Sequence, residues 1–186
     1  MLSFFKKPLK HILMTGGSVG GRTTLLYHNI IHHTEIGKSR LVLPTIGCNR
    51  EELSYNKIKF VFWDYGTSIL NVRTLLKNVY PITNGVMFLI DSTFTSKEEK
   101  EDSIKYLKDV LSDQTLKNIP IAILMNKSDR PKEFTTNDIL TSFYNDNNYD
   151  KYFKGRLWKF FETSTYDQKS IDDVLHWMYN TIQINN

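Results

Sequence analysis

The sequence has little of what marks secreted or membrane-spanning proteins. Cys48 is the single cysteine among 186 residues, so an internal disulfide is excluded and a reducing compartment is expected. No apolar run reaches the roughly 18 residues that a membrane-spanning helix needs. The apolar patch Met1–Phe5 is too short for a secretory signal, and Leu2 stands where N-myristoylation requires glycine. We therefore expect a cytoplasmic protein that is neither secreted, transmembrane nor N-myristoylated.

The sequence also has little excess of charge of either sign. Lys and Arg number 24 against 20 Asp and Glu, which gives a formal net charge of +4. This excess suits an anionic ligand or an acidic membrane surface, but it is too small to argue for nucleic acid. Long repeats and Pro-rich linkers are also missing, so we predict one domain, residues 10–186, after an N-terminal arm, residues 1–9.

The N-terminal arm combines apolar side chains with Lys6 and Lys7. Such a segment can lie at an anionic membrane, where each basic residue contributes on the order of 1 kcal/mol. Pro8 limits any helix, and one weak signal does not give stable anchoring. Two interpretations stay open: a flexible or docked arm, and weak peripheral contact with a membrane.

Strand-like and helix-like patterns alternate along the chain. We predict strands at 10–15, 52–53, 57–63, 85–91, 119–125 and 158–162. We predict helices at 23–32, 97–112, 138–144 and 171–184, and a surface loop at 145–150. Strands separated by helices indicate an α/β fold, a mostly parallel sheet with helices on both faces.

A glycine-rich turn, Gly16–Thr23, lies between the first predicted strand and helix. It nearly matches the phosphate-loop pattern of Gly, four residues, Gly, Lys and Ser or Thr. Glycines let successive backbone amides point at phosphate oxygens, and the following helix adds its positive end. The predicted phosphate-binding residues are Gly16, Ser18, Val19, Gly20, Gly21, Arg22, Thr23 and Thr24. The alternative is a plain tight turn.

One residue of the phosphate-loop pattern differs, because Arg22 stands in the place of Lys. Lysine is a compact point charge, whereas arginine is a larger planar fork. Two outcomes stay open. Arg22 keeps the charge and binds phosphate with altered geometry, or it points outward and leaves the phosphates undercompensated.

A second motif, Asn126-Lys127-Ser128-Asp129, follows a buried predicted strand. The Asp129 carboxylate can accept hydrogen bonds from N1 and the 2-amino group of guanine, which adenine does not offer. The four residues alone are a weak signal. Their position after a phosphate loop makes guanine the predicted base, and it disfavours a P-loop kinase or ATPase.

Taken together with these two motifs, residues 10–183 resemble the Arf and Arf-like branch of the small GTPases. Leu43–Asn49 is similar to the first switch segment of that branch, and Phe62–Gly66 is similar to the entry of the second. Ser164 and Thr165 stand where the branch places a backbone amide against the guanine carbonyl. The resemblance implies the P-loop NTPase fold with a mostly parallel six-stranded sheet, and GTP or GDP as ligand.

The resemblance also implies a magnesium ion and a switching mechanism. Thr23, Thr45 and Asp64 are the expected Mg²⁺ residues, and Thr67 stands at the position whose amide contacts the γ-phosphate. In the branch, GTP orders the switch segments and protein effectors read them, often in membrane traffic. Trp63 and Phe60 lie between the switches and are candidates for a partner surface.

Two departures from the branch fall at the γ-phosphate. Thr67 replaces a glycine, and Ser68 replaces the glutamine that orients the attacking water. A β-branched residue restricts the backbone, and serine is too short to reach the water. We assign no catalytic residue and expect weak or absent GTP hydrolysis. The alternative is a pseudo-GTPase scaffold that binds a partner without nucleotide cycling, for which the signal-recognition-particle receptor beta subunit is a precedent.

Overall fold

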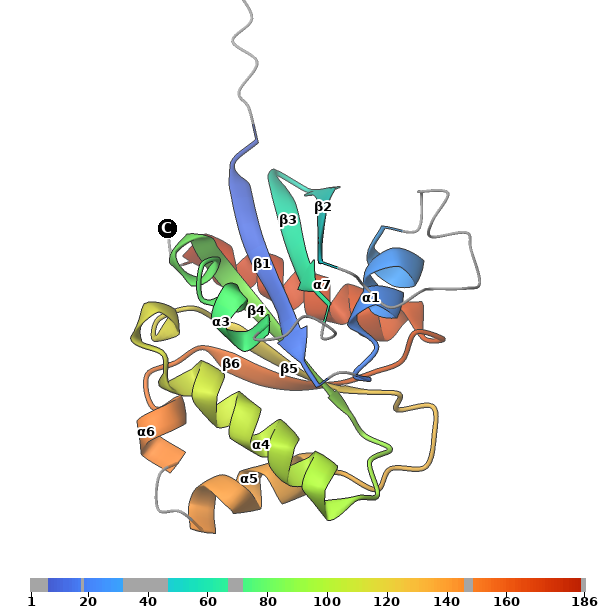
Figure 1. Ribbon diagram of the computed structural model, residues 1–186. Coiled ribbons are helices and arrows are strands. Elements are labelled where there is room, and N and C mark those ends of the chain that lie inside the picture. The colour runs from blue at the N-terminus through green and yellow to red at the C-terminus, as the bar shows by residue number, and fades with distance from the viewer. Residues whose placement is uncertain (1–6, 18, 32–46, 67–71, 146–148, 185–186) are drawn as a thin grey trace, which may run out of the picture.

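A single six-stranded sheet organises the chain (Figure 1). The computed structural model describes residues 7–17, 19–31, 47–66, 72–145 and 149–184. The strand order is β2-β3-β1-β4-β5-β6, and every neighbouring pair is parallel except β2 and β3. The predicted fold class, a mostly parallel sheet with helices, is confirmed.

The strands occupy the predicted places, but β2 is longer than predicted. They are β1 (Leu9–Gly16), β2 (Cys48–Tyr55), β3 (Ile58–Tyr65), β4 (Thr83–Asp91), β5 (Ile121–Asn126) and β6 (Trp158–Thr163). Ser54 and Tyr55, predicted as turn, belong to β2. The turn is formed by Asn56, whose φ of 50° is left-handed, and by Lys57, which was predicted as strand. Exposed and half-buried residues alternate along β2 because it is an edge strand with one covered face. Its polar residues conceal it from a search for apolar runs.

The long helices confirm the predictions, and two short ones were missed. The helices are α1 (Arg22–Leu25), α3 (Val72–Leu76), α4 (Lys97–Ser112), α5 (Thr136–Asn145), α6 (Tyr149–Phe153) and α7 (Gln168–Ile184). A π-helical turn, Leu26–Ile30, continues α1, and 3-10 turns lie at Tyr80–Ile82 and Gln114–Leu116. The predicted loop at 145–150 is wrong at both ends, because Asn145 is the last residue of α5 and Tyr149 is the first of α6. Aromatic packing explains α6, since the Phe153 ring centroid lies 4.9 Å from that of Phe143 and 4.5 Å from that of Trp158.

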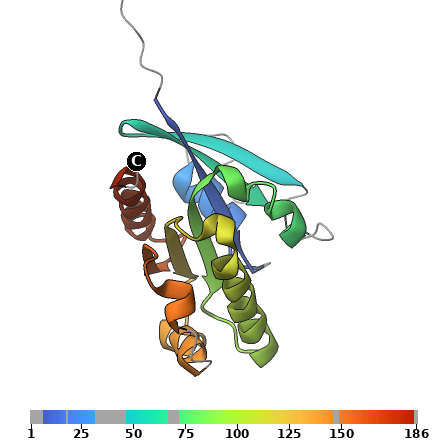
Figure 2. The same ribbon diagram turned by 90° about the vertical axis from the view of Figure 1, so that its left-hand side faces the viewer.

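Helices cover both faces of the sheet (Figure 2), and each face has its own hydrophobic core. Ile12 and Met14 of β1 pack in the core that includes α1 and α7, whereas Leu13 packs in the core that includes α4, α5 and α6. The side chains of a strand point alternately to opposite faces, so a strand covered on both sides must be apolar throughout. Among the described residues, no helix has the length and apolar character needed to cross a membrane.

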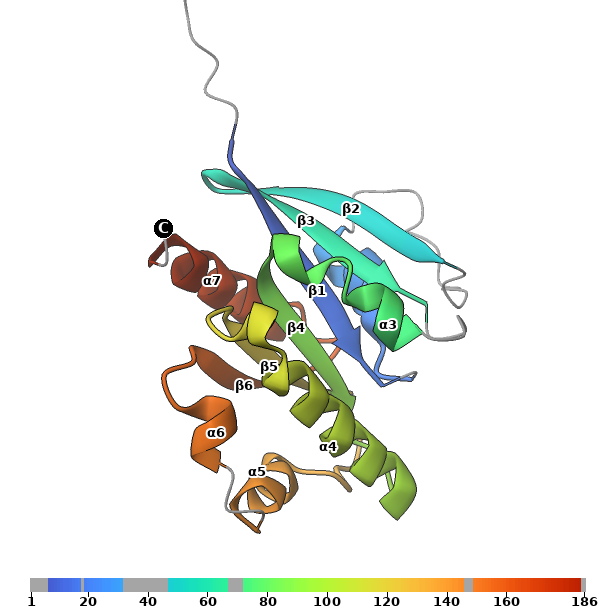
Figure 3. The same cartoon turned by 60° about the vertical axis from the view of Figure 1, so that its left-hand side comes forward.

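The carboxyl ends of the parallel strands meet at one edge of the sheet (Figure 3). Gly16 of β1 is in register with Leu89 of β4, Asp91 of β4 with Asn126 of β5, and Asn126 with Thr163 of β6. The glycine-rich turn and the Asn126 motif therefore lie side by side, although more than a hundred residues separate them. In open α/β sheets this edge is where ligands bind.

Candidate nucleotide-binding site

The glycine-rich turn after β1 has a backbone that only glycine tolerates at two points. Gly16 has φ of +130°, and a Cβ there would lie 2.0 Å from the carbonyl oxygen of Leu89. Gly21 has φ of +84°, and its Cβ would lie 2.6 Å from Nδ2 of Asn126. The turn closes through the Gly20 amide, which donates to the Gly17 carbonyl at 3.3 Å. The chain thus passes from β1 into α1 through a tight turn that has no room for a side chain at Gly16 or Gly21, and such a close backbone turn before a helix suits a phosphate.

Asn126 ties this cradle to the rest of the edge. Its side-chain nitrogen Nδ2 donates to the Gly20 carbonyl at 2.8 Å, and its Oδ1 accepts from Thr163 Oγ1 at 3.2 Å. Its own carbonyl accepts from Ser92 Oγ at 2.8 Å. Asn126 is 1% exposed, so these bonds form out of contact with water. One buried amide therefore fixes the turn against β4, β5 and β6.

The predicted base-reading residues come together beyond Asn126. Ser164 Oγ donates to Asp129 Oδ1 at 2.6 Å, and the same hydroxyl accepts from the Tyr166 amide at 3.1 Å. Asp129 keeps about a third of its side chain exposed (32%), and its Oδ2 lies 3.9 Å from Nε of Arg130. The Thr165 carbonyl accepts from Asn29 Nδ2 at 3.2 Å, which anchors this corner to the π-helical turn. Asp129 is therefore oriented by one partner and still accessible to a ligand.

Lys127 pairs with a carboxylate that the sequence analysis did not assign. Its backbone has φ of 63°, and its Nζ lies 2.5 Å from Oδ2 of Asp91, the last residue of β4. Burial raises the pKa of Asp91, but hydrogen bonds from Lys127 and Thr93 outweigh burial and hold that pKa below its ordinary value. The sequence signal that could have revealed this pair is Asp91 itself, the acidic residue that ends the apolar run 85–91. An acidic residue at that position predicts a charged partner at the same edge of the sheet.

Arg22 points into the turn, so the outward alternative is wrong. The side chain is 7% exposed. Its Nη1 donates to the carbonyls of Gly16 at 2.8 Å and Gly17 at 2.6 Å, and its Nη2 donates to the Tyr65 carbonyl at 3.2 Å. Its Nε lies 3.3 Å from Oδ1 of Asp64, which completes a buried ion pair. The guanidinium thus clamps the start of the turn to the end of β3.

Thr23 and Asp64, two of the three predicted metal residues, are in contact. Thr23 Oγ1 donates to Asp64 Oδ2 at 2.7 Å, and Nδ2 of Asn49 lies 3.5 Å from the same oxygen. Hydroxyl and carboxylate oxygens are the ligands that Mg²⁺ prefers. However, Asp64 is fully buried and already paired with Arg22, so a second cation at this carboxylate would oppose the first. The donor set suits Mg²⁺, but the site with Arg22 in this position does not fit it.

Comparison with known proteins decides the family. The sequence profile of the ADP-ribosylation factor family matches residues 1–182. The chain belongs to the ADP-ribosylation factor (Arf) family. It is therefore an Arf-like small GTPase, a nucleotide-binding switch, and the resemblance seen in the sequence is confirmed.

Named relatives of this Arf-family chain agree in length and fold. It is 27% identical over 188 residues to ADP-ribosylation factor-like protein 1 of Drosophila melanogaster, covering 98% of the chain and 97% of that protein. It is 30% identical to ADP-ribosylation factor K of Dictyostelium discoideum, covering 92% and 84%. The solved structure of the Arl6 BBS3 small GTPase from Trypanosoma brucei, with the bound nucleotide analogue GppNp, has a TM-score of 0.75 at 16% identity, covering 96% of this chain and 99% of that one.

Several predicted residues of the Arf-family site lie outside the described residues. They are Ser18, Thr45, Thr67 and Ser68, and the same holds for residues 1–6 of the arm. Val19 is described and half exposed, and Thr24 lies on the first turn of α1. The assignments of all the site residues to phosphate, base or metal stay predictions.

The region between the switches corrects one prediction for this Arf-family chain. Phe60 is fully buried in the core, so it offers no surface to a partner. Trp63 is half-buried, and its Nε1 donates to Nδ1 of His11 at 3.0 Å. The Arg50 guanidinium lies 5.7 Å from the centroid of the Trp63 ring. Burial and the positive charge of Arg50 lower the pKa of His11, which keeps the ring neutral as an acceptor.

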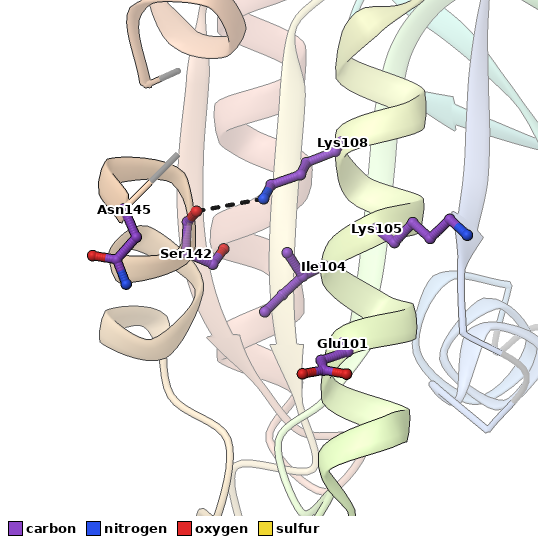
Figure 4. A pocket seen from close by; sticks show the side chains of 6 residues that line it. All are labelled: Glu101, Ile104, Lys105, Lys108, Ser142 and Asn145. Atoms are coloured by element: carbon purple, nitrogen blue, oxygen red, sulfur yellow. Dashed lines mark hydrogen bonds between the residues drawn. The ribbon is translucent and has the colours of Figure 1, made fainter. Parts of the chain in front are cut away.

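A separate hollow of about 430 Å³ lies between α4 and α5 (Figure 4). It is lined by Glu101, Ile104, Lys105, Lys108, Ser142 and Asn145. Lys108 Nζ reaches across it to the Ser142 carbonyl at 3.4 Å. None of the predicted nucleotide residues lines this hollow, so it is not part of the candidate site.

Proposed function

We propose that this Arf-family protein binds GDP and GTP and works as a molecular switch in membrane traffic, with weak or absent intrinsic hydrolysis. One observation carries the proposal: the Asn126 side chain bonds to Gly20, which holds the glycine turn and the base-reading motif as one rigid unit. A ligand with a phosphate tail and a purine can therefore contact both segments at once, because they are already held side by side.

Guanine selection is argued from Asp129. Ser164 fixes one carboxylate oxygen by donating to it, and the carboxylate accepts from N1 and the 2-amino group of guanine. Adenine lacks these two donors, so adenine would leave the carboxylate unpaired, which is costly. At the other end, amides of the glycine turn and the positive end of α1 would hold the phosphates.

Weak hydrolysis is argued from the sequence of the second switch. Phosphoryl transfer depends mainly on positioning and electrostatic stabilisation. Thr67 and Ser68 supply neither the free backbone of glycine nor the reach of glutamine. Hydrolysis should therefore suffer more than binding.

Effectors and membranes complete the proposal. The nucleotide state would order the segments around Thr45 and Thr67, and protein effectors would read those segments and the strands between them. The arm, residues 1–9, would add weak contact with an anionic membrane surface. The protein would then associate with a membrane only peripherally.

The decisive experiment determines which nucleotide the purified chain carries, how selectively it binds nucleotides and how fast it hydrolyses GTP. Native mass spectrometry of the purified chain should show GDP or GTP, and titration with fluorescent GDP should give saturable binding that excess GTP displaces and excess ATP does not. Single-turnover assay of GTP-loaded protein should show hydrolysis far slower than that of an ordinary small GTPase. Saturable binding with rapid turnover would remove the hydrolysis part of the proposal alone.

A scaffold without nucleotide cycling is the second candidate. Arg22 favours it, because its guanidinium already bonds to the loop carbonyls and to Asp64. A mass spectrum free of nucleotide, together with no calorimetric heat for GDP or GTP, would select the scaffold and reject the switch.

A further inference from the structure

The contact between Arg22 and Asp64 sets this chain apart from a phosphate loop that carries lysine. Asp64, the last residue but one of β3, lies next to the loop, and neither side chain has much exposure (7% for Arg22 and 0% for Asp64). The pair is therefore a built feature of the site rather than a surface contact, because exposed pairs are weak and readily exchanged.

The arginine fork explains why one side chain makes all these bonds. It uses Nε once, both hydrogens of Nη1 and one of Nη2, so four of its five N–H groups are engaged. A lysine ammonium has three donors at a single point and cannot reach two loop carbonyls, Tyr65 and Asp64 together. The arrangement is specific to the residue that this chain has in place of lysine.

Asp64 has no oxygen left outside this network. Oδ1 faces Arg22, and Oδ2 accepts from Thr23 Oγ1 at 2.7 Å with Asn49 Nδ2 at 3.5 Å. A divalent cation here would face a guanidinium at close range in a buried site, where like charges are poorly screened. To admit the cation, Arg22 would have to move away, and the carbonyls of Gly16 and Gly17 would then lose their hydrogen-bond donor.

We infer that the Arg22 guanidinium takes the place of the divalent cation in this protein, so that it binds guanine nucleotides without Mg²⁺. The inference rests on the proposed function. The fixed positive charge neutralises the Asp64 carboxylate and lies within the phosphate loop, while Thr23 serves Asp64 as a hydrogen-bond donor and not as a metal ligand.

The first test compares affinity with and without the cation. The full chain, freed of nucleotide, is titrated with fluorescent GDP in Mg²⁺ and again in excess EDTA. The inference expects dissociation constants that agree within about threefold, a difference of less than 1 kcal/mol. A loss of tenfold or more in EDTA overturns the inference and leaves the proposed function standing. No binding in either buffer removes both.

The second test restores the metal site. Arg22→Lys should release Asp64, so that the variant loses at least tenfold in GDP affinity when EDTA replaces Mg²⁺. Manganese, read by its electron paramagnetic resonance signal, should bind the variant with GDP more tightly than it binds free GDP, whereas the wild type with GDP should show no such tightening. Equal behaviour of the two proteins would overturn the inference.

Two controls separate the role of Arg22 from general damage. Arg50→Lys changes another arginine of the domain that pairs with a carboxylate, Glu52 at 2.8 Å, outside the site, and should leave the independence from metal intact. Asp64→Asn added to Arg22→Lys should abolish the tighter manganese binding. Thermal melts of each variant show whether it folds, and if Arg22→Lys does not fold, the wild-type EDTA titration still decides.

Discussion

At the scale of single residues, the site depends on pairs in which one side chain orients another. Asp129 faces the ligand edge, and Ser164 holds it there through a bond of 2.6 Å. An isolated carboxylate on a loop would rotate freely, and its partner removes that freedom before a ligand arrives. A substitution in such a pair should change ligand binding without preventing folding, so these pairs are the best places to test function.

Asp129→Asn should exchange the preferred base. The asparagine amide can donate to a carbonyl, so it matches the 2-oxo group of xanthine, whereas it repels the 2-amino group of guanine. We expect GDP affinity to fall by about a hundredfold or more and xanthosine diphosphate to bind, as measured by displacement of fluorescent nucleotide. Loss of both ligands with an unchanged melting temperature would contradict the contact.

Ser164→Ala should weaken the same site without changing the base. The variant removes the donor to Asp129 and leaves the carboxylate in place. A net hydrogen bond to a charged group contributes about 1.5–3 kcal/mol, which corresponds to roughly tenfold to a hundredfold in affinity. Calorimetric titration with GDP measures the loss, and Ser142→Ala, which removes a serine hydroxyl of α5 outside the candidate site, is the matched control and should leave the affinity unchanged.

At the scale of elements, the close approach of α7 to the sheet depends on a missing side chain. A Cβ at Gly85 of β4 would lie 2.9 Å from Met178 Sδ and 3.1 Å from Ile182 Cδ1. Gly85→Ala should therefore destabilise the fold by about 1–3 kcal/mol, because a packed core yields little to an added methyl group. Denaturant unfolding measures the change.

A double-mutant cycle tests whether that clash is the cause. Ile182→Val removes one of the three side-chain atoms that the new Cβ would meet, the other two being Met178 Sδ at 2.9 Å and Ile12 Cδ1 at 3.0 Å. The loss from Gly85→Ala should be smaller in the Ile182→Val background than in the wild type, and coupling of about 0.5 kcal/mol or more is expected for residues in contact. Strict additivity would show that Ile182 is not the cause and would leave the clash with the nearer Met178 and Ile12 atoms.

The elements that could be predicted are those whose residues repeat a pattern. Strand β4 and helix α4 were predicted within two residues because burial on both faces, or on one, imposes a periodicity. Strand β2 and helix α6 were cut short or missed, because an edge strand carries polar residues and a five-residue helix depends on Phe153 packing. The local sequence pattern does not reveal the tertiary contacts that stabilise such elements.

The site followed the same rule. The glycine turn and the Asn126 motif could be predicted because each is contiguous in sequence. The bond from Asn126 to Gly20, the pair of Lys127 with Asp91 and the pair of Arg22 with Asp64 join residues far apart in the chain. Only the register of the sheet brings them together, and spacing along one sequence does not fix side-chain direction.

For the molecule as a whole, titrating groups on several elements give stability the same dependence on acid. Hydrogen bonds from Lys59 and Arg50 lower the pKa of Glu52, and hydrogen bonds from Thr135 lower that of Asp138. The pKa of Asp91 is also lowered, and burial lowers that of His11 from 6.5. In each case the unfolded chain takes up protons at a higher pH than the folded protein, so acid favours unfolding.

Alkali acts in the opposite direction through buried phenols. Burial raises the pKa values of Tyr27 and Tyr80 above the ordinary 10.0. Their contribution is fully present below pH 10 and is lost as the pH rises, because the unfolded chain then releases protons that the folded protein retains. The free energy of unfolding should therefore form a plateau between about pH 7 and pH 9 and fall on both sides.

His11 accounts for the first decline below neutrality, which gives the plateau a specific test. Because its pKa is lowered when folded, its contribution is complete above the unfolded value of 6.5 and decreases as the pH falls toward the folded value. His11→Gln keeps an acceptor for Trp63 Nε1 and does not titrate. Urea unfolding at pH 7.5 and pH 5.5 should show a smaller loss in the variant than in the wild type. Equal losses in the variant and the wild type would place the decline on other groups.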